Sequence, residues 1–274
     1  MEYNKDNPLK VVTLCSGYDS QCLALERLKS VYPEFDYELV AWAEFDPEIK
    51  TPLDKQPAVV AHNALFPQWA DRNLGDMTKI DWTQVNDFDL LFYSTPCQSV
   101  SQAGLQHGFT EGSGTRSSII WNVRDAVKIK RPKFLCLENV KAMVSGKFVG
   151  MFNLWQFELE RLGYRNFAQV LNAKDYGVPQ NRERIFLVSI RVDDEHNMPK
   201  YYFPKPFPLE RKLKDVLEDN VDDKYYLSDL SIARMQRNMD KEDISVNVEG
   251  SAKTVCASLN KITTFDNYIK DEQI

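Results

Sequence analysis

Short apolar runs and amphipathic stretches alternate along most of the chain. Runs typical of buried strands cover residues 10–14, 38–46, 90–93, 133–137, 167–171 and 185–190. Apolar residues at helical spacing occupy residues 22–28, 118–130 and 152–162, and a short helix is expected at 211–217. This alternation predicts an α/β fold with a doubly wound, mostly parallel, Rossmann-like sheet.

The apolar run between Asp89 and Pro96 delivers Cys97 into the loop past the end of a predicted strand. Open α/β sheets bind their ligands at the carboxyl ends of their strands. With a proline before it and Gln98 after it, the thiol is placed like a presented nucleophile. The alternative is an inert small residue, because free cysteine is usually buried.

Polar residues also stand at the ends of other predicted strands. Glu138 and Asn139 follow one strand, and Arg182 and Arg184 come just before another. A nucleophile at Cys97, an acid and a guanidinium form a chemically coherent set. The same set has no convincing histidine base, which argues against a protease triad. A surface charge cluster is the alternative for the two arginines.

The first predicted strand, turn and helix have the form of a cofactor-binding unit. The turn contains Gly17 but not the full Gly-x-Gly-x-x-Gly pattern, so the dinucleotide signal is weak by itself. Glu44 ends the second strand, where an acid can accept hydrogen bonds from ribose hydroxyls, and Phe45 beside it can stack on a purine. Asp76 can receive an adenine amino group. An ordinary acidic loop is the alternative for residues 44–46.

Composition limits the class of protein further. The 274 residues are 43% hydrophobic and contain no run of eighteen apolar residues, so we expect one core with a small appendage and no membrane span. The start of the chain lacks a signal peptide's apolar segment. Five scattered cysteines without a Cys-x-x-Cys pair and three separated histidines favour a reducing cytoplasm and no metal site. The formal charge of −6 argues mildly against a nucleic-acid enzyme.

Several motifs, taken in order, resemble those of DNA (cytosine-5) methyltransferases. They are Pro96-Cys97-Gln98, Glu138-Asn139-Val140, the segment 180–184 (Gln-Asn-Arg-Glu-Arg), the segment 171–180, and the segment 203–207 (Phe-Pro-Lys-Pro-Phe). The last two resemble the bacterial enzymes most closely. The resemblance spans roughly residues 10–210 and implies a class I S-adenosylmethionine-dependent methyltransferase fold.

The resemblance implies a function in DNA methylation, as in restriction–modification or phage enzymes of the cytoplasm and nucleoid. The substrate would be a cytosine flipped out of double-stranded DNA. Cys97 would attack C6 of the base, which activates C5 toward the methyl group. Glu138 would contact N3 and the exocyclic amine, and Arg184 would donate to O2. Arg182 would support the catalytic loop or a phosphate, and either arginine can favour the Cys97 thiolate.

The resemblance also assigns residues to the cofactor, S-adenosylmethionine, and to the base. The turn with Cys15, Ser16 and Gly17 would hold the methionine part, while Glu44 would bind the ribose and Asp76 the adenine amine. Phe45 and Met77 would flank the purine, and Pro96 completes the cofactor set. The substrate set consists of Gln98, Ser101, Arg116 and Asn139. Two departures from the family are Cys15 in place of phenylalanine and Asp19-Ser20 in place of glycines.

A further departure concerns the C-terminal part of the chain. We expect a catalytic domain over residues 8–195, followed at 196–274 by a linker and the beginning of a target-recognition region. The family's two closing motifs are not found. Either the chain is part of a longer protein or a second chain supplies the remainder. We therefore expect this chain alone to bind duplex DNA weakly and to methylate poorly or not at all.

Other readings are a non-catalytic or partner-dependent subunit of a split methyltransferase, and a tRNA cytosine-5 methyltransferase. The tRNA family prefers a second proline where Thr95 stands, which disfavours that reading. A zinc deaminase needs Pro-Cys-x-x-Cys, but position 100 is Val. A nicotinamide-dependent enzyme would need more glycines around Gly17 and would not need Cys97.

Overall fold

The computed structural model describes residues 2–96, 112, 116–222, 225–239, 245–254 and 268–269. The chain forms two compact units. The first combines Met1–Val170 with Arg184–Tyr202, and the second combines Leu171–Glu183 with Phe203–Ile274. The predicted boundary near residue 195 between a catalytic domain and a following region stays a prediction.

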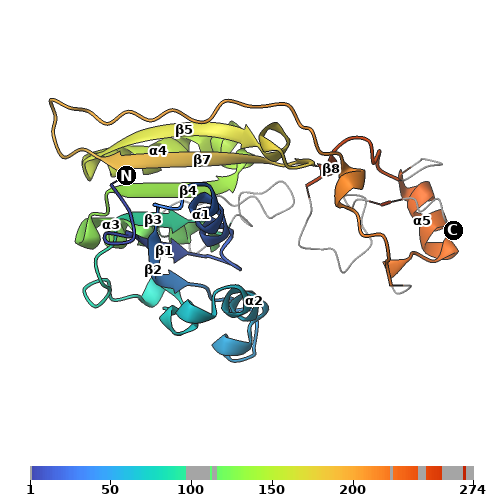
Figure 1. Cartoon of the computed structure of the whole chain (residues 1–274), viewed down its shortest axis with the longest axis horizontal. Coiled ribbons are helices and arrows are strands. Elements are labelled where there is room, and N and C mark those ends of the chain that lie inside the picture. Colours follow the sequence, from blue (N-terminus) through green and yellow to red (C-terminus); the bar gives the residue numbers. More distant parts are fainter. Residues whose placement is uncertain are drawn as a thin grey trace. The chain divides into compact units, whose positions relative to one another are not determined.

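A six-stranded sheet is the main feature of the first unit (Figure 1). Its spatial order is β2-β1-β3-β4-β7-β5. The neighbours β2, β1, β3 and β4 run parallel, and β7 runs antiparallel to β4. The bounds are β1 Leu9–Leu14, β2 Tyr37–Ala43, β3 Leu90–Tyr93, β4 Phe134–Val140, β5 Tyr164–Asn172 and β7 Glu183–Arg191. The predicted mostly parallel α/β sheet is confirmed.

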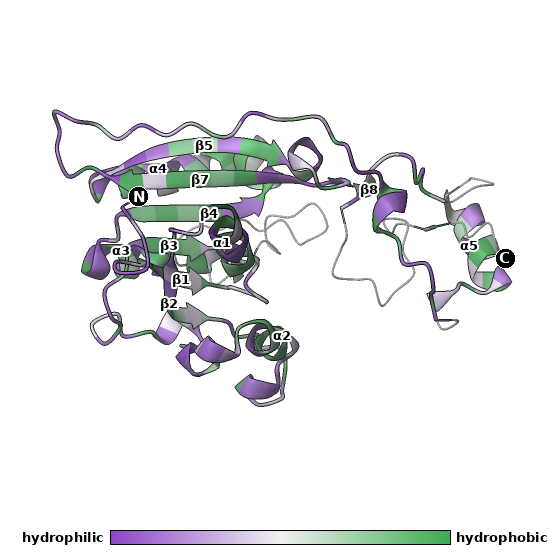
Figure 2. Cartoon of the chain, viewed as in Figure 1, coloured by the Kyte–Doolittle hydropathy of each residue, from purple (hydrophilic) through white to green (hydrophobic). Residues whose placement is uncertain are grey.

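Helices cover both faces of this sheet, as a doubly wound fold requires. Their bounds are α1 Ser20–Val31, α2 Pro57–Leu65, α3 Val123–Lys130 and α4 Val149–Arg161. One buried cluster joins the strands to Cys22 and Leu25 of α1 and Val59 of α2. The other joins them to Val127 of α3 and Trp155 of α4. The strands between these layers are apolar (Figure 2), because both of their faces are buried.

The strand β1 shows how the sequence assigns side chains to these two layers. Successive residues of a strand point to opposite faces. Leu9 and Val11 therefore join the cluster with α1, while Val12 and Leu14 join the cluster with α3 and α4. Thr13 is a fully buried polar residue in this strand. By alternation it shares the face of Leu9 and Val11.

The second unit contains short elements. They are the 3₁₀ helices Ala173–Tyr176 and Leu213–Val216, the helix α5 Asp229–Met239, and the paired strands β6 Gln180–Asn181 and β8 Ala252–Lys253. The side chain of Thr254 donates a hydrogen bond to the Asn181 carbonyl (2.8 Å). Within the described part of the chain, no helix is long and apolar enough to cross a membrane.

Candidate functional site

The sheet reverses its winding between β1 and β3. From β1 the chain moves to β2 on one side, and then returns to β3 on the other side. In open α/β sheets, ligands bind beyond the carboxyl ends of the strands at such a switch point. Two buried hydroxyls lie just past these strand ends, Ser16 Oγ after β1 and Thr95 Oγ1 after β3. Neither has a hydrogen-bond partner in the described structure.

The turn after β1 has an unusual backbone. Cys15, Gly17 and Asp19 have φ angles of 52°, 59° and 65°, in the left-handed region. Only Gly17 adopts this region without a steric cost, and a Cβ built on it meets no atom within 4 Å. The turn therefore leaves open space beside its backbone, where a ligand can approach the main chain closely.

Glu44 connects this turn to the end of β2. Its Oε2 accepts a hydrogen bond from the Gly17 backbone N–H at 2.7 Å. Asn73 fixes the backbone of Glu44 from the other side, because its Oδ1 accepts from the Glu44 N–H at 3.2 Å. Phe45, the predicted purine-stacking residue, is 37% exposed. The structure thus brings Gly17 and Glu44 together, as the predicted cofactor site requires.

Asp76 and Met77 lie in the next segment of this site. The Cys15 Sγ is 3.4 Å from the Met77 Sδ, and Met77 is buried. Asp76 Oδ1 accepts hydrogen bonds from the backbone and hydroxyl of Thr78, at 3.0 and 2.7 Å. Burial raises the pKa of Asp76, but the hydrogen bonds from Thr78 and Lys79 outweigh it, so the pKa is lowered. Asp76 is therefore held as an acceptor.

The predicted acid and one predicted arginine form an ion pair at the end of β4. Arg184 Nε lies 3.1 Å from Glu138 Oε1. The pair forms because β7 is antiparallel to β4, which places the beginning of β7 beside the carboxyl end of β4, with Val140 opposite Arg184. The side chains of Arg184 and Glu138 are 18% and 30% exposed. Both groups are therefore fixed and still accessible to a substrate.

Asn139 ties this strand end to the segment before Cys97. It is buried, and its Nδ2 donates to the Thr95 carbonyl at 3.0 Å. Its Oδ1 accepts from the Val140 N–H at 2.9 Å. These two bonds connect the ends of β3 and β4, and the substrate contact predicted for Asn139 stays a prediction.

The remaining predicted residues are placed as follows. Pro96 is half-buried at the end of the described β3 segment. Cys97, Gln98 and Ser101 lie outside the described residues, as does the side chain of Arg116, whose backbone begins a 3₁₀ helix.

Arg182 belongs to the second unit, whereas Glu138 and Arg184 belong to the first. The Arg182 backbone N–H donates to Asn172 Oδ1 at 2.9 Å, and its carbonyl accepts from the Ala173 N–H at 3.0 Å. These bonds hold the backbone of the segment that carries Arg182, within its own unit. The role predicted for its side chain stays a prediction.

Cys22 and Cys136 fit the inert alternative for a cysteine. Burial, followed by the charge of Glu138, raises the pKa of Cys136 to about 12. Burial and the neighbouring Asp19 also raise the pKa of Cys22. A thiol with a raised pKa is a poor nucleophile at neutral pH. Within the described residues, no group of three or more histidine, cysteine or acidic side chains is arranged to hold a metal ion.

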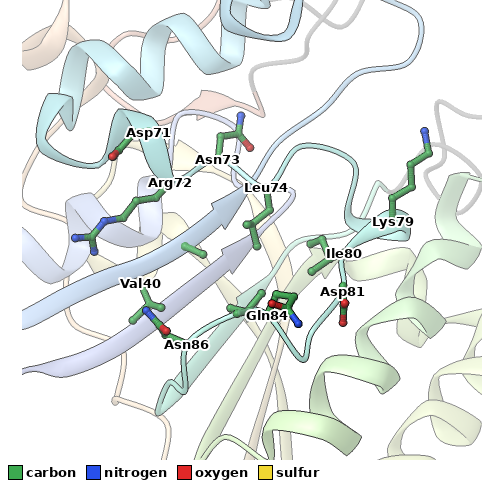
Figure 3. A pocket seen from close by; sticks show the side chains of 12 residues that line it. Val40, Asp71, Arg72, Asn73, Leu74, Lys79, Ile80, Asp81, Gln84 and Asn86 are labelled. Atoms are coloured by element: carbon green, nitrogen blue, oxygen red, sulfur yellow. The ribbon is translucent and has the colours of Figure 1, made fainter.

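A surface cavity of about 410 Å³ lies beside the edge strand β2 (Figure 3). Val40, Arg72 and Gln84 are among its lining residues. None of the predicted cofactor residues lines it. Its lining mixes charged, amide and aliphatic side chains, and it is separate from the turn at the switch point.

The switch-point turn, the acid that binds it and the ion pair at a neighbouring strand end define an α/β domain of the methyltransferase type. The chain belongs to the C-5 cytosine-specific DNA methylase family, whose sequence model matches residues 9–271.

Individual proteins agree with this assignment. The type II methyltransferase M2.ScrFI of Lactococcus lactis subsp. cremoris is 42% identical over 163 residues, which are 60% of this chain and 44% of the relative. M.SsoII of Shigella sonnei is 31% identical over 82% of this chain and 54% of its own length. The chain thus spans about half the length of these curated relatives.

A solved structure shares the fold. The crystal structure of a DNMT2 variant from Spodoptera frugiperda superimposes with a TM-score of 0.65 at 18% identity. The match covers 89% of this chain and 69% of that one. At this identity the likeness shows the fold alone.

Proposed function

We propose that this chain transfers a methyl group from S-adenosylmethionine to C5 of a cytosine in double-stranded DNA. Family membership supports the reaction class, and the names of the bacterial relatives support DNA as the substrate. The observation that carries the proposal is the Glu138–Arg184 pair, held beside the strand that leads to Cys97. DNA of a bacterial or phage-infected cell is the expected substrate.

The residues at the switch point fit the cofactor. Ser16 Oγ and Thr95 Oγ1 are buried and unpaired, so they offer polar contacts that the protein itself does not use. Glu44 and Asp76 are acceptors for ribose hydroxyls and the adenine amine, and Met77 offers an apolar surface to the purine. When bound, S-adenosylmethionine supplies an electrophilic methyl group.

The side chains of Cys97, Glu138 and Arg184 would each contact a different part of the cytosine ring. The Cys97 thiolate adds to C6, which moves electron density to C5. Glu138 contacts N3 and the exocyclic amine, and Arg184 donates to O2, so both stabilise the charge that develops in the ring. C5 would accept the methyl group with S-adenosylhomocysteine as the leaving group, after which a base removes the C5 proton and the C6–S bond breaks. The ring regains its double bond and the thiolate is restored.

Trapping on 5-fluorocytosine DNA tests this proposal, because fluorine at C5 cannot leave as a proton. The substrate is a duplex library of random sequence, incubated with the full chain and S-adenosylmethionine. We expect an adduct that survives denaturing electrophoresis, requires the cofactor, is lost in Cys97→Ser and persists in Cys136→Ala. Wild-type chain that forms no adduct even when a C-terminal partner chain is supplied, or a Cys97→Ser chain that forms one, contradicts the proposal. Methyl transfer to tRNA in preference to DNA would support the tRNA alternative.

A further inference from the structure

Asp19 has an uncommon position in the turn after β1. It is fully buried and has a φ angle of 65°, a conformation that a glycine adopts without strain. A carboxylate in this place has two costs, a backbone cost and the cost of removing a charge from water. Its side chain must therefore make contacts that offset both costs.

Three elements supply these contacts. Asp19 Oδ2 accepts a hydrogen bond from the Thr13 hydroxyl of β1 at 2.7 Å. Its Oδ1 caps α1 by accepting from the Cys22 N–H at 3.3 Å. His62 of α2 approaches from a third direction, with Nε2 at 3.6 Å from Oδ2. One side chain thus links a strand, the first turn of a helix and a second helix.

His62 has no other polar role in the described structure. Its side chain is fully buried, and neither ring nitrogen has a hydrogen-bond partner. The ring stacks on Trp42 of β2, with centroids 3.6 Å apart and an angle of 16° between the planes. A buried unpaired imidazole is costly, and its Nε2 faces the Asp19 carboxylate. The stacking fixes the ring in the orientation that lets this nitrogen reach Asp19.

The backbone of Asp19 connects this buried group to the ligand-facing side of the turn. Its N–H donates to the Ser16 carbonyl at 2.8 Å, which closes the turn. Ser16 carries one of the unpaired hydroxyls at the switch point, and Gly17 next to it donates to Glu44. A shift of Asp19 therefore moves the residues that face the cofactor.

We propose that Asp19 and His62 are a buried pair of positioning residues that set the affinity of the turn for S-adenosylmethionine. The inference rests on the proposed function, because the cofactor identifies what the turn binds. Neither side chain reaches the protein surface, so the pair acts through Ser16 and Gly17. Removal of the imidazole leaves the Asp19 carboxylate buried, with Thr13 and Cys22 as its partners.

A double-mutant cycle on the full chain tests the pair, with S-adenosylmethionine binding measured by calorimetry. We expect His62→Phe, which keeps a ring for Trp42, to raise Kd at least about tenfold, and Asp19→Asn at least about threefold. The double variant should bind no more weakly than His62→Phe alone, because both changes remove one interaction. His62→Gln keeps a side-chain N–H donor that can extend as far as Nε2 does. It should therefore bind S-adenosylmethionine nearly as well as the wild-type chain, unlike His62→Phe.

Val59→Ala is the matched control, since Val59 is a buried residue of the same helix and its side chain is apolar. It should lower thermal stability and change Kd by less than about twofold. Effects of His62→Phe and Asp19→Asn that multiply, or a His62→Phe Kd equal to that of Val59→Ala, would overturn the inference.

Hydrogen exchange separates this inference from the proposed function. In His62→Phe the amides of Asp19 and Cys22 should exchange faster, and in Val59→Ala they should not. Wild-type chain that binds no S-adenosylmethionine contradicts the proposed function, while the exchange experiment still decides whether the pair holds the turn. Unchanged exchange in His62→Phe would overturn the inference. If His62→Phe does not fold, Asp19→Asn and His62→Gln carry both measurements.

Discussion

Glu138 and Arg184 meet at 3.1 Å because the strand that carries Arg184 runs antiparallel to the strand that carries Glu138. The parallel strands β2, β1, β3 and β4 all have their carboxyl ends at this edge of the sheet. The antiparallel strand β7 presents its beginning there, which brings the Arg184 guanidinium to the Glu138 carboxylate.

Glu138→Gln should lower the rate of methyl transfer by about 100-fold, the usual contribution of a positioned acid. The free energy of unfolding should fall by no more than about 1 kcal/mol, because the ion pair is partly exposed to solvent. The measurement is transfer of a labelled methyl group to DNA, together with urea denaturation. Glu158→Gln is the control, since Glu158 pairs with Arg161 at 3.3 Å away from the strand ends. Equal rates in the two variants would contradict the assigned role of Glu138.

Gly17→Ala should weaken S-adenosylmethionine binding at least about tenfold, or about 1.4 kcal/mol. The added methyl group meets no protein atom within 4 Å, so it projects into the space beside the turn. Separately, the positive φ angle of 59° should lower the free energy of unfolding of this variant by ~1–2 kcal/mol. Gly146→Ala has a similar backbone angle (51°) and equally open surroundings, so it should share the stability loss but keep the affinity. Calorimetry and thermal unfolding of both variants distinguish the two effects.

Asn139→Ala should destabilise the chain by about 1–3 kcal/mol, because it leaves the buried Thr95 carbonyl without its donor. It should also slow adduct formation by Cys97, since the end of β3 is no longer tied to β4. Asn166→Ala removes a comparable bridge, from Asn166 to the Gln156 carbonyl at 2.8 Å. Adduct formation that slows equally in both variants would show that Asn139 contributes only to stability.

Glu249 in the second unit should titrate far below an ordinary glutamate. Hydrogen bonds from Lys212 and then Lys214 lower its pKa from 4.5 to about 2. The contribution of this cluster to stability is therefore complete above pH 4.5 and is lost as the pH falls toward 2. An NMR titration of the Glu249 carboxyl group should give this low midpoint, and added salt should raise it. A midpoint near 4.5 would show that the ion pairs do not form in solution.

Much of the fold could be predicted from hydrophobic periodicity. The strands at Leu9–Leu14, Phe134–Val140 and Glu183–Arg191 lie where the apolar runs predict them. The stretch predicted as one helix over 118–130 is instead a 3₁₀ helix, Arg116–Asn122, followed by α3. The expected helix at 211–217 is a short 3₁₀ helix, Leu213–Val216. No element was predicted where α2 and α5 lie. The α2 segment is apolar at most of its positions, so it shows no clear helical period. The α5 segment lies in a stretch rich in charged and amide residues.

The candidate site was predictable in its residue types but not in its connections. The acids and the arginines follow from strand ends and motifs. The contacts between Gly17 and Glu44, or between Cys15 and Met77, depend on distances that a sequence does not contain. Asp19 and His62 were missed because 42 intervening positions separate them, and each alone looks like an ordinary loop or helix residue. A histidine inside the mostly apolar segment 57–65 was the available signal.

The late position of β7 in the sequence also determines when the Glu138–Arg184 pair can form during synthesis of the chain. A ribosome releases Cys97 and Glu138 well before it releases Arg184. Until β7 inserts beside β4, Glu138 lacks Arg184 as its ion-pair partner. Growing chains fold from the N-terminal side. The fold therefore delays formation of the Glu138–Arg184 pair until synthesis of the first unit is almost finished.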